Sequence, residues 1–122
     1  MLLESPYKQD NIVLNLAFEF ALAIIEFTEI LEKEKKFNMA NQLFRSGTSI
    51  HANIREAQNA ESKADFIHKM KLSAKEAEET EGWLLVCHHA KSYPDCDDLL
   101  IKLASILKLL NKIIGTTKKS IS

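Results

Sequence analysis

The chain has 122 residues, 46% of them hydrophobic and 27% charged, and its formal net charge at pH 7 is −1. This length predicts one domain, spanning 1–122, with enough apolar residues for a folded core. A protein dedicated to nucleic acid would usually carry a strong basic excess, which this chain lacks. Only 3 Gly and 2 Pro interrupt the sequence, which favours long helices over many short strands.

The cysteines and the N-terminus indicate the cellular compartment. Cys87 and Cys96 do not form a CxxC motif, so we interpret them as reduced thiols rather than a disulfide. The N-terminal apolar run is too short for a signal peptide and is followed at once by Glu4. The most apolar segment, 12–25, is too short and too polar to span a bilayer. We therefore expect a cytoplasmic protein without a membrane partner.

Apolar residues recur with helical periodicity in four segments: 11–34, 39–59, 63–91 and 97–114. Short turns make sequential helices run antiparallel. The predicted fold is therefore all-α, an antiparallel up-down-up-down four-helix bundle. We expect residues 1–10 to form a loose N-terminal arm. Gly115 should end the last helix and leave residues 116–122 as a frayed tail.

Residues that favour helix starts mark the turns. Asn38, Ser62 and Asp95 are candidate N-caps, because their side chains can accept hydrogen bonds from the first backbone N–H groups of a helix. Ser62 and Asp65 also form a capping-box pattern, with Asp in place of the more usual Glu.

The first predicted helix has an apolar surface wider than one neighbouring layer can bury. Its polar residues are confined to a narrow line: Asn15, Glu19, Glu26, Glu29 and Lys33. In a domain this small, we expect part of the apolar surface to meet another subunit.

Small residues predict a close crossing of the second and third helices. Gly47 lies on the apolar row of the second helix, where a glycine costs about 1 kcal/mol relative to alanine. Ser73, Ala77 and Thr80 lie on the apolar row of the third helix and would let another helix approach closely. We expect these four residues to meet.

Polar residues cluster on the same two helices: Gln42, Arg45, Ser49, Asn53, Arg55, Glu56, Glu76 and Glu79. Arg45 and Arg55 can face Glu76, Glu79 or Glu81 on the third helix. One interpretation is a structural ion-pair network that fixes the helix register. The other is a surface for a ligand or partner. We favour the first, because charge-rich helix faces are usually solvated or paired.

The pattern of metal ligands is too sparse for a metal site. Di-iron bundles need two Glu-x-x-His motifs and two further inward glutamates. The nearest motif here joins Asp65 to His68 and occurs once. The adjacent His88 and His89 would point about 100° apart on a helix and could not share one ion well. We expect neither a metal nor another cofactor.

Nucleophilic catalysis is not favoured either. Cys87 with His88, or Ser49 with His51, could be proposed, but residues one or two apart on a helix do not face each other. The sequence contains no nucleophile elbow and no Gly-rich phosphate loop. We expect a protein without enzymatic activity.

Lysines could form a basic face on the last two helices: Lys69, Lys71, Lys75, Lys102, Lys108, Lys112, Lys118 and Lys119. Acidic residues are interleaved on the third helix, and the aromatic residues belong mostly to the core row of the first helix. No platform for stacking bases is therefore visible.

The stretch from Gln42 to Trp83 resembles a known family, the bacterial four-helix bundle proteins of the 23S rRNA intervening sequence. The residues that match its pattern are Gln42, Arg45, Ser49, Ile50, Asn53, Ile54 and Glu56, and then Ser62, Phe66, Ala74, Glu79, Trp83 and Leu84. Ala57 stands where many members have Gly. The resemblance covers the second and third helices by motif and the whole chain by layout.

The resemblance implies a homo-oligomer, with a pentamer as the known arrangement, and no established enzymatic activity. Related accessory proteins of diversity-generating retroelements are strongly basic and bind nucleic acid, which the near-neutral charge here does not favour. We therefore expect a non-enzymatic homo-oligomer with a scaffold or protein-interaction role. The alternatives are an RNA- or nucleoprotein-binding accessory factor, and an enzyme with a site at Arg45, Glu76 and Glu79.

Overall fold

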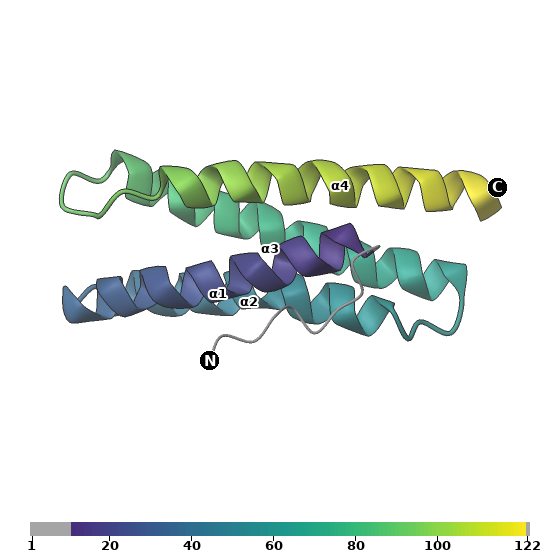
Figure 1. Ribbon diagram of the computed structural model, residues 1–122, viewed down its shortest axis with the longest axis horizontal. Coiled ribbons are helices and arrows are strands. Elements are labelled where there is room, and N and C mark those ends of the chain that lie inside the picture. The colour runs from purple at the N-terminus through teal and green to yellow at the C-terminus, as the bar shows by residue number, and fades with distance from the viewer. Residues whose placement is uncertain (1–10, 122) are drawn as a thin grey trace.

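The computed structural model describes residues 11–121, and in them four helices lie side by side (Figure 1). Their bounds are α1 Ile12–Lys33, α2 Phe37–Ala57, α3 Lys63–His89 and α4 Asp97–Ile121. The all-α four-helix architecture predicted from the sequence is confirmed, and the first three helices lie within two residues of their predicted bounds. The predicted N-terminal arm, 1–10, lies outside the described residues. Among the described helices, none combines the length and hydropathy that a bilayer-crossing segment needs.

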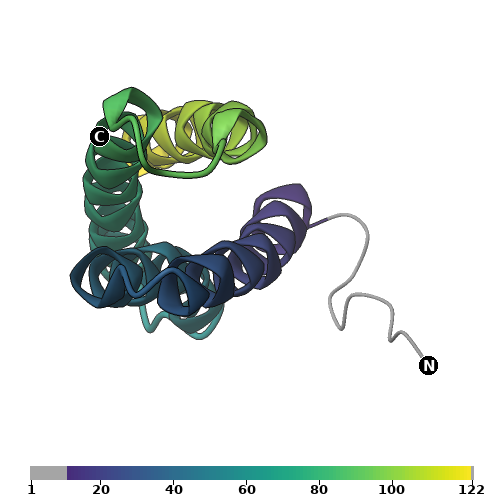
Figure 2. The ribbon, with the colours of Figure 1, turned by 90° about the vertical axis from the view of Figure 1, so that its left-hand side faces the viewer.

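Residue pairs that join neighbouring helices show that the helices run antiparallel. Between α2 and α3, Ser46 meets Thr80 and Ile50 meets Ser73, so one number rises as the other falls. The same opposed order links α1 to α2 and α3 to α4, through the pairs Asn11 and Gln58, Ile24 and Gly47, Lys63 and Ser120, and His88 and Asp97. Viewed along the helices, the four form an arc whose most open side lies between α1 and α4 (Figure 2).

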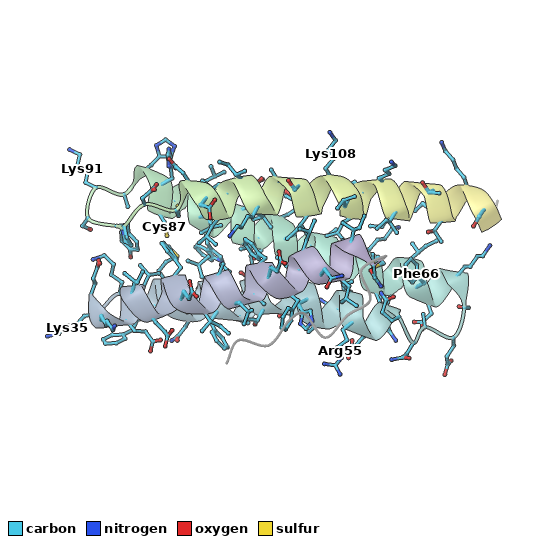
Figure 3. All side chains as sticks on the ribbon, in the orientation of Figure 1. Lys35, Arg55, Phe66, Cys87, Lys91 and Lys108 are labelled. Atoms are coloured by element: carbon cyan, nitrogen blue, oxygen red, sulfur yellow. The ribbon has the colours of Figure 1, made fainter. Side chains whose placement is uncertain are left out.

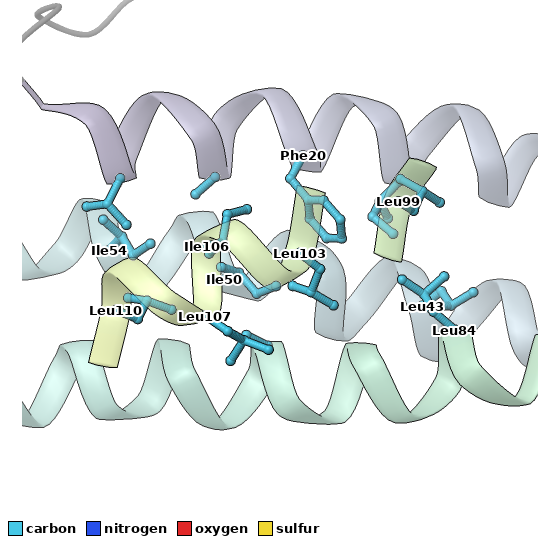
Figure 4. Packing of buried hydrophobic residues seen from close by; sticks show 14 of the residues in the cluster. Phe20, Leu43, Ile50, Ile54, Leu84, Leu99, Leu103, Ile106, Leu107 and Leu110 are labelled. Carbon is cyan, nitrogen blue, oxygen red and sulfur yellow. The ribbon is translucent and has the colours of Figure 1, made fainter. Parts of the chain in front are cut away.

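The core runs along the bundle axis and draws on all four helices (Figure 4). Phe20 of α1, Leu43 of α2, Leu84 of α3 and Leu103 of α4 are each at most 1% exposed. Burying one such side chain stabilises the fold by about 1.5–3 kcal/mol. The apolar rows read from the sequence are therefore the residues that hold the bundle together.

The turn between α1 and α2 is a Schellman motif built on a lysine. Lys35 has a φ of 64°, in the left-handed region that glycine usually occupies. The N–H of Lys36 donates to the Leu31 carbonyl at 2.8 Å, and the N–H of Lys35 donates to the Glu32 carbonyl at 2.9 Å. Because this turn is so short, α2 begins at Phe37 and contains Asn38. The prediction that Asn38 caps α2 is therefore wrong.

The predicted cap of α3 is confirmed. The Ser62 side chain accepts a hydrogen bond from the N–H of Asp65 at 3.0 Å. In return, the Asp65 carboxylate accepts one from the N–H of Glu61 at 3.2 Å, and this bond lowers the pKa of Asp65. Before α4, the Asp95 carboxylate accepts a hydrogen bond from the N–H of Asp97 at 3.1 Å.

Gly115 does not end α4, so the predicted helix end is wrong, and the predicted frayed tail is wrong for residues 116–121. The helix continues to Ile121. Its last turns are joined to the rest of the bundle, because the Lys63 ammonium on α3 donates to the Ser120 hydroxyl at 3.2 Å. The Thr117 hydroxyl donates to the Ile113 carbonyl at 2.8 Å within the helix. Ser122 lies outside the described residues.

Gly47 faces α1 rather than α3, which corrects the predicted crossing. A Cβ atom at Gly47 would lie 2.8 Å from Cγ1 and 3.0 Å from Cγ2 of Ile24. Ile24 is fully buried and β-branched, so these atoms cannot easily move away. The glycine therefore permits close approach of α2 to α1, while other residues make the contact with α3.

Replacing glycine by alanine should have opposite effects at two helical positions. Gly47→Ala is expected to lower the free energy of unfolding by about 1–3 kcal/mol, because its methyl group overpacks against Ile24. Gly82→Ala is the matched control, since a Cβ atom there meets nothing within 4 Å. It should raise stability by about 0.5–1 kcal/mol through helix propensity. Urea denaturation measures both changes, and a Gly47→Ala protein as stable as the wild type would contradict the close contact with α1.

Candidate functional site

The interface of α2 and α3 contains buried hydroxyl groups at its centre. The Ser73 hydroxyl donates to the Ile50 carbonyl at 2.8 Å. The Thr80 hydroxyl donates to the Glu76 carbonyl at 2.7 Å and lies 2.9 Å from the Ser46 hydroxyl. Serine and threonine carry one hydroxyl hydrogen each, so Ser46 supplies the hydrogen of the pair with Thr80. The polar atoms at this close crossing are thus paired.

Above this seam, Arg45 joins α2 to α3 on the surface. One guanidinium nitrogen lies 3.2 Å from the Glu76 carboxylate, and the other contacts Glu79. The Trp83 indole donates to the same Glu79 carboxylate at 3.2 Å. The Arg45 side chain is 50% exposed, so water and salt screen these ion pairs. The structure thus brings together Arg45, Glu76 and Glu79, as the sequence predicted.

The prediction that Arg55 also faces the glutamates is wrong. Arg55 is exposed and projects away from α2 (Figure 3). Ten helical residues separate it from Arg45, a rise of about 15 Å, so the antiparallel α3 presents residues well before Glu76 at that level. The positive charge of Arg55 contributes to a lowered pKa of His51, although burial is the larger cause.

The remaining residues of the predicted cluster lie on the same side of α2 but not in the ion-pair group. Ser49 donates its hydroxyl to the Arg45 carbonyl at 2.6 Å within the helix. Gln42 and Glu56 are exposed, and Asn53 is half-buried.

Sequence reasoning missed two partners of this interface. Ser46 was not singled out, although it pairs with Thr80, and Trp83 was not linked to Glu79. The spacing of Glu79 and Trp83 by four residues on one helix could have indicated the second contact.

The chemistry available at the Arg45 cluster is limited. Arg45 forms ion pairs with the carboxylates of Glu76 and Glu79, and Trp83 donates a hydrogen bond to Glu79. Neither carboxylate is therefore an isolated base. A shallow hollow of about 300 Å³ adjoins the cluster, lined by Glu79, Gly82, Trp83 and Val86. Within residues 11–121, no group of three or more His, Cys, Asp or Glu side chains is placed to hold a metal ion. His88 instead lies 2.9 Å from Asp97 and joins the end of α3 to the start of α4.

A second candidate surface is an apolar groove between α1 and α4, the pair of neighbouring helices with the least extensive contact. One hollow of about 180 Å³ is lined by Leu16, Glu19, Phe20, Ile101, Lys102, Ser105 and Ile106. A second, of about 220 Å³, is lined by Ala23, Glu26, Phe27, Ile30, Asp95, Cys96, Asp98, Leu99 and Lys102. Lys102 lines both hollows, so they are neighbours, and we refer to the two together as the groove between α1 and α4.

Comparison with known proteins identifies the family. The family model of the 23S rRNA-intervening sequence protein matches residues 9–112. The chain belongs to this family. A crystal structure of a protein of unknown function from the S23 ribosomal protein family of Bacteroides thetaiotaomicron VPI-5482 is also similar. The sequences are 42% identical, the TM-score is 0.80, and the match covers 84% of this chain and 97% of the other. No curated protein matches the chain.

The family match spans both candidate surfaces. The residues that carried the resemblance, from Gln42 to Trp83, lie on α2 and α3, and the structure shows what they do there. Arg45 and Glu79 form the ion-pair group, and Ile50 and Ile54 are fully buried in the core. The motif of the 23S rRNA-intervening sequence proteins therefore corresponds, in this chain, to the packing interface of two helices.

The buried contact between α2 and α3 should contribute more to the free energy of unfolding than the surface ion pairs of Arg45. Arg45→Ala is expected to lower the free energy of unfolding by at most about 1 kcal/mol, because Arg45 is half exposed. Ala77→Leu should cost about 1–3 kcal/mol, because Ala77 is fully buried and a larger side chain would overpack the core. Chemical denaturation of both variants checks the order. A larger loss for Arg45→Ala would show that the ion pairs dominate.

Both cysteines should resist thiol reagents in the folded protein. Burial, followed by the neighbouring Cys96, raises the pKa of Cys87 from 9.0 to about 11, and burial also raises that of Cys96. At pH 8 both thiols are therefore almost entirely protonated, and the thiolate is the reactive form. Labelling with a maleimide should be slow at pH 8 and become rapid in denaturant. Rapid labelling of the native protein would contradict the burial of these residues.

Proposed function

We propose that this protein is a non-enzymatic, self-associating four-helix bundle that serves as a scaffold or protein-interaction module in the cytoplasm. The observation that carries this proposal is the groove between α1 and α4. Its floor is apolar, and two large apolar side chains beside it are exposed in a single chain: Ile30 at 44% and Ile101 at 68%. Contiguous exposed apolar surface of this kind is typical of protein interfaces.

The dimensions of the groove favour a protein partner over a small molecule. Its two hollows, of about 180 and 220 Å³, are smaller than the roughly 300–1,000 Å³ typical of ligand pockets. They lie between α1 and the first part of α4. A helix or helix pair from another protein molecule fits such an elongated surface better than a compact ligand does.

A second copy of the chain is the partner that we propose. The apolar surface of α1 is wider than α2 and α4 cover, and the family resemblance implies a pentamer. A ring of five copies requires a heterologous interface, in which the groove of one copy receives a different surface of the next. The acidic side chains at the groove support this arrangement, because two facing grooves would bring Glu19, Glu26 and Asp98 of each copy together.

The absence of enzymatic activity is part of the same proposal. It is supported by the engagement of Glu76 and Glu79 with Arg45, which leaves these carboxylates as structural acceptors. It is also supported by the high pKa of Cys87, which makes this thiol a poor nucleophile.

Charges placed in the groove should dissociate the oligomer. Ile30→Glu combined with Ile101→Glu is expected to shift the protein from an oligomer to a monomer in multi-angle light scattering. Both side chains are already partly exposed, so the monomer should stay folded. Leu22→Glu is the matched control, because Leu22 is 49% exposed on α1 but does not line the groove. A monomeric wild-type protein at micromolar concentration would rule out self-association, and loss of the oligomer in the control alone would exclude the groove.

A further inference from the structure

The charges of the chain are unevenly distributed along the bundle, although they nearly cancel in total. Residues 63–75 of α3 and 105–120 of α4 together carry eight lysines and one acidic residue, Asp65. Lys69 points about 200° away from Lys71 around α3 and pairs with Asp65. We call the other seven the lysine cluster: Lys63, Lys71, Lys75, Lys108, Lys112, Lys118 and Lys119. Segment 76–81, in the middle of α3, and segment 95–98, at the start of α4, carry seven acidic residues and no lysine. The sequence alone does not show that the two lysine-rich segments meet.

The antiparallel pairing of α3 and α4 brings the two lysine-rich segments to the same end of the bundle. The start of α3 lies beside the end of α4, where Lys63 contacts Ser120 (Figure 1). Lys118 on α4 lies near enough to Lys71 on α3 to lower the pKa of Lys71. Lys108 projects away from the bundle further along α4 (Figure 3).

The two neighbouring ammonium groups repel each other, and water screens this repulsion because both side chains are exposed. Lys69 differs from them, because it lies 3.4 Å from the Asp65 carboxylate. An anion placed between Lys71 and Lys118 would turn this repulsion into two attractions and restore the pKa of Lys71. The end of α4 adds further positive charge on the same side of the bundle.

We propose that the lysine cluster binds the phosphodiester backbone of double-helical nucleic acid without sequence specificity. The cluster is elongated, because Lys108 and Lys119 are separated by about 16 Å along α4. An extended row of charges matches a chain of phosphates better than a single phosphate ion. Lysines act as point charges and lack the planar fork with which arginine reads guanine, so the cluster recognises the backbone and not the bases.

The surroundings of the cluster favour nucleic acid over other polyanions. Phe66 is the one aromatic residue in the two lysine-rich segments, and it packs against the core. Bases therefore have no stacking platform, which favours a duplex over a single strand. An anionic membrane would require several exposed apolar anchors. The lysine-rich segments expose one large apolar side chain, Leu72 at 38%, while Leu107, Leu110 and Ile114 of α4 are buried in the bundle.

The near-neutral net charge does not oppose this binding. Asp97 and Lys118 lie at opposite ends of α4, about 30 Å apart. At physiological ionic strength the Debye length is about 8 Å, so the acidic residues at the start of α4 are largely screened from a ligand near Lys118. The local charge decides the interaction, and net charge is a poor guide when the charges are segregated in space.

Fluorescence anisotropy with a labelled 20-base-pair RNA duplex, and with a DNA duplex of the same sequence, tests this proposal over a range of salt concentrations. The wild-type protein should bind both duplexes, with affinity falling steeply as salt rises. Lys71→Glu combined with Lys118→Glu should weaken binding at least tenfold. It should also reduce the slope of log affinity against log salt by about two, one for each lost phosphate contact.

The matched control is Lys33→Glu combined with Lys35→Glu, which changes the net charge equally at the other end of the bundle. Both lysines are exposed, and this variant should bind the duplexes within about twofold of the wild type. Lys71→Gln combined with Lys118→Gln removes the repulsion without adding acids, so it should lose affinity while its melting temperature stays unchanged or rises. Equal losses in the control and the Lys71 variant would overturn the proposal. So would duplex binding that does not depend on salt, or binding to phosphatidylserine vesicles without binding to either duplex.

Discussion

The close packing of α2 against both of its neighbours is the constraint on which the rest of the bundle depends. On one side, Gly47 has no Cβ atom, and this allows α2 to pack closely against Ile24 of α1. On the other side, the hydroxyls of Ser46 and Thr80 pair across the contact with α3. Because neither side tolerates a bulkier residue, α2 fixes the positions of α1 and α3. The surface ion pairs of Arg45 follow from that placement.

The tight α1–α2–α3 packing has a consequence on the opposite side of the molecule. The first and last helices, α1 and α4, are not consecutive in the chain, and their contact is the least extensive of the four neighbouring pairs. The apolar surface of α1 that they leave uncovered, including Ile30, borders an open groove. One physical cause, the unequal tightness of the helix contacts, thus accounts for both a rigid signature motif and an incompletely buried interface. The proposed self-association would complete the burial of the groove.

Charge behaves differently from packing in this fold. Along α4, Asp97 and Lys118 are separated by about 30 Å, which exceeds the screening length of the solvent. The surface between α3 and α4 can therefore attract a polyanion at one end while the chain as a whole stays nearly neutral. The two proposals use different faces, the groove between α1 and α4 and the lysine cluster on α3 and α4, so each can hold or fail without the other. A ring of copies would also multiply weak phosphate contacts through avidity.

The sequence by itself determined the four helices, their core rows and the meeting of Arg45 with Glu76 and Glu79, because helical periodicity and short turns leave few other arrangements. It did not determine which neighbour Gly47 faces, since a glycine on an apolar row can serve either adjacent helix. It also misplaced the end of α4, because a glycine within a helix costs only about 1 kcal/mol and need not end it, and α4 continues to Ile121. The sequence also did not predict the left-handed turn at Lys35, because a lysine takes this conformation only where the surrounding structure holds it there. The meeting of Lys71 with Lys118 belongs to the tertiary structure alone. Electrostatic interaction depends on distance in space, and only the folded bundle brings these two residues together.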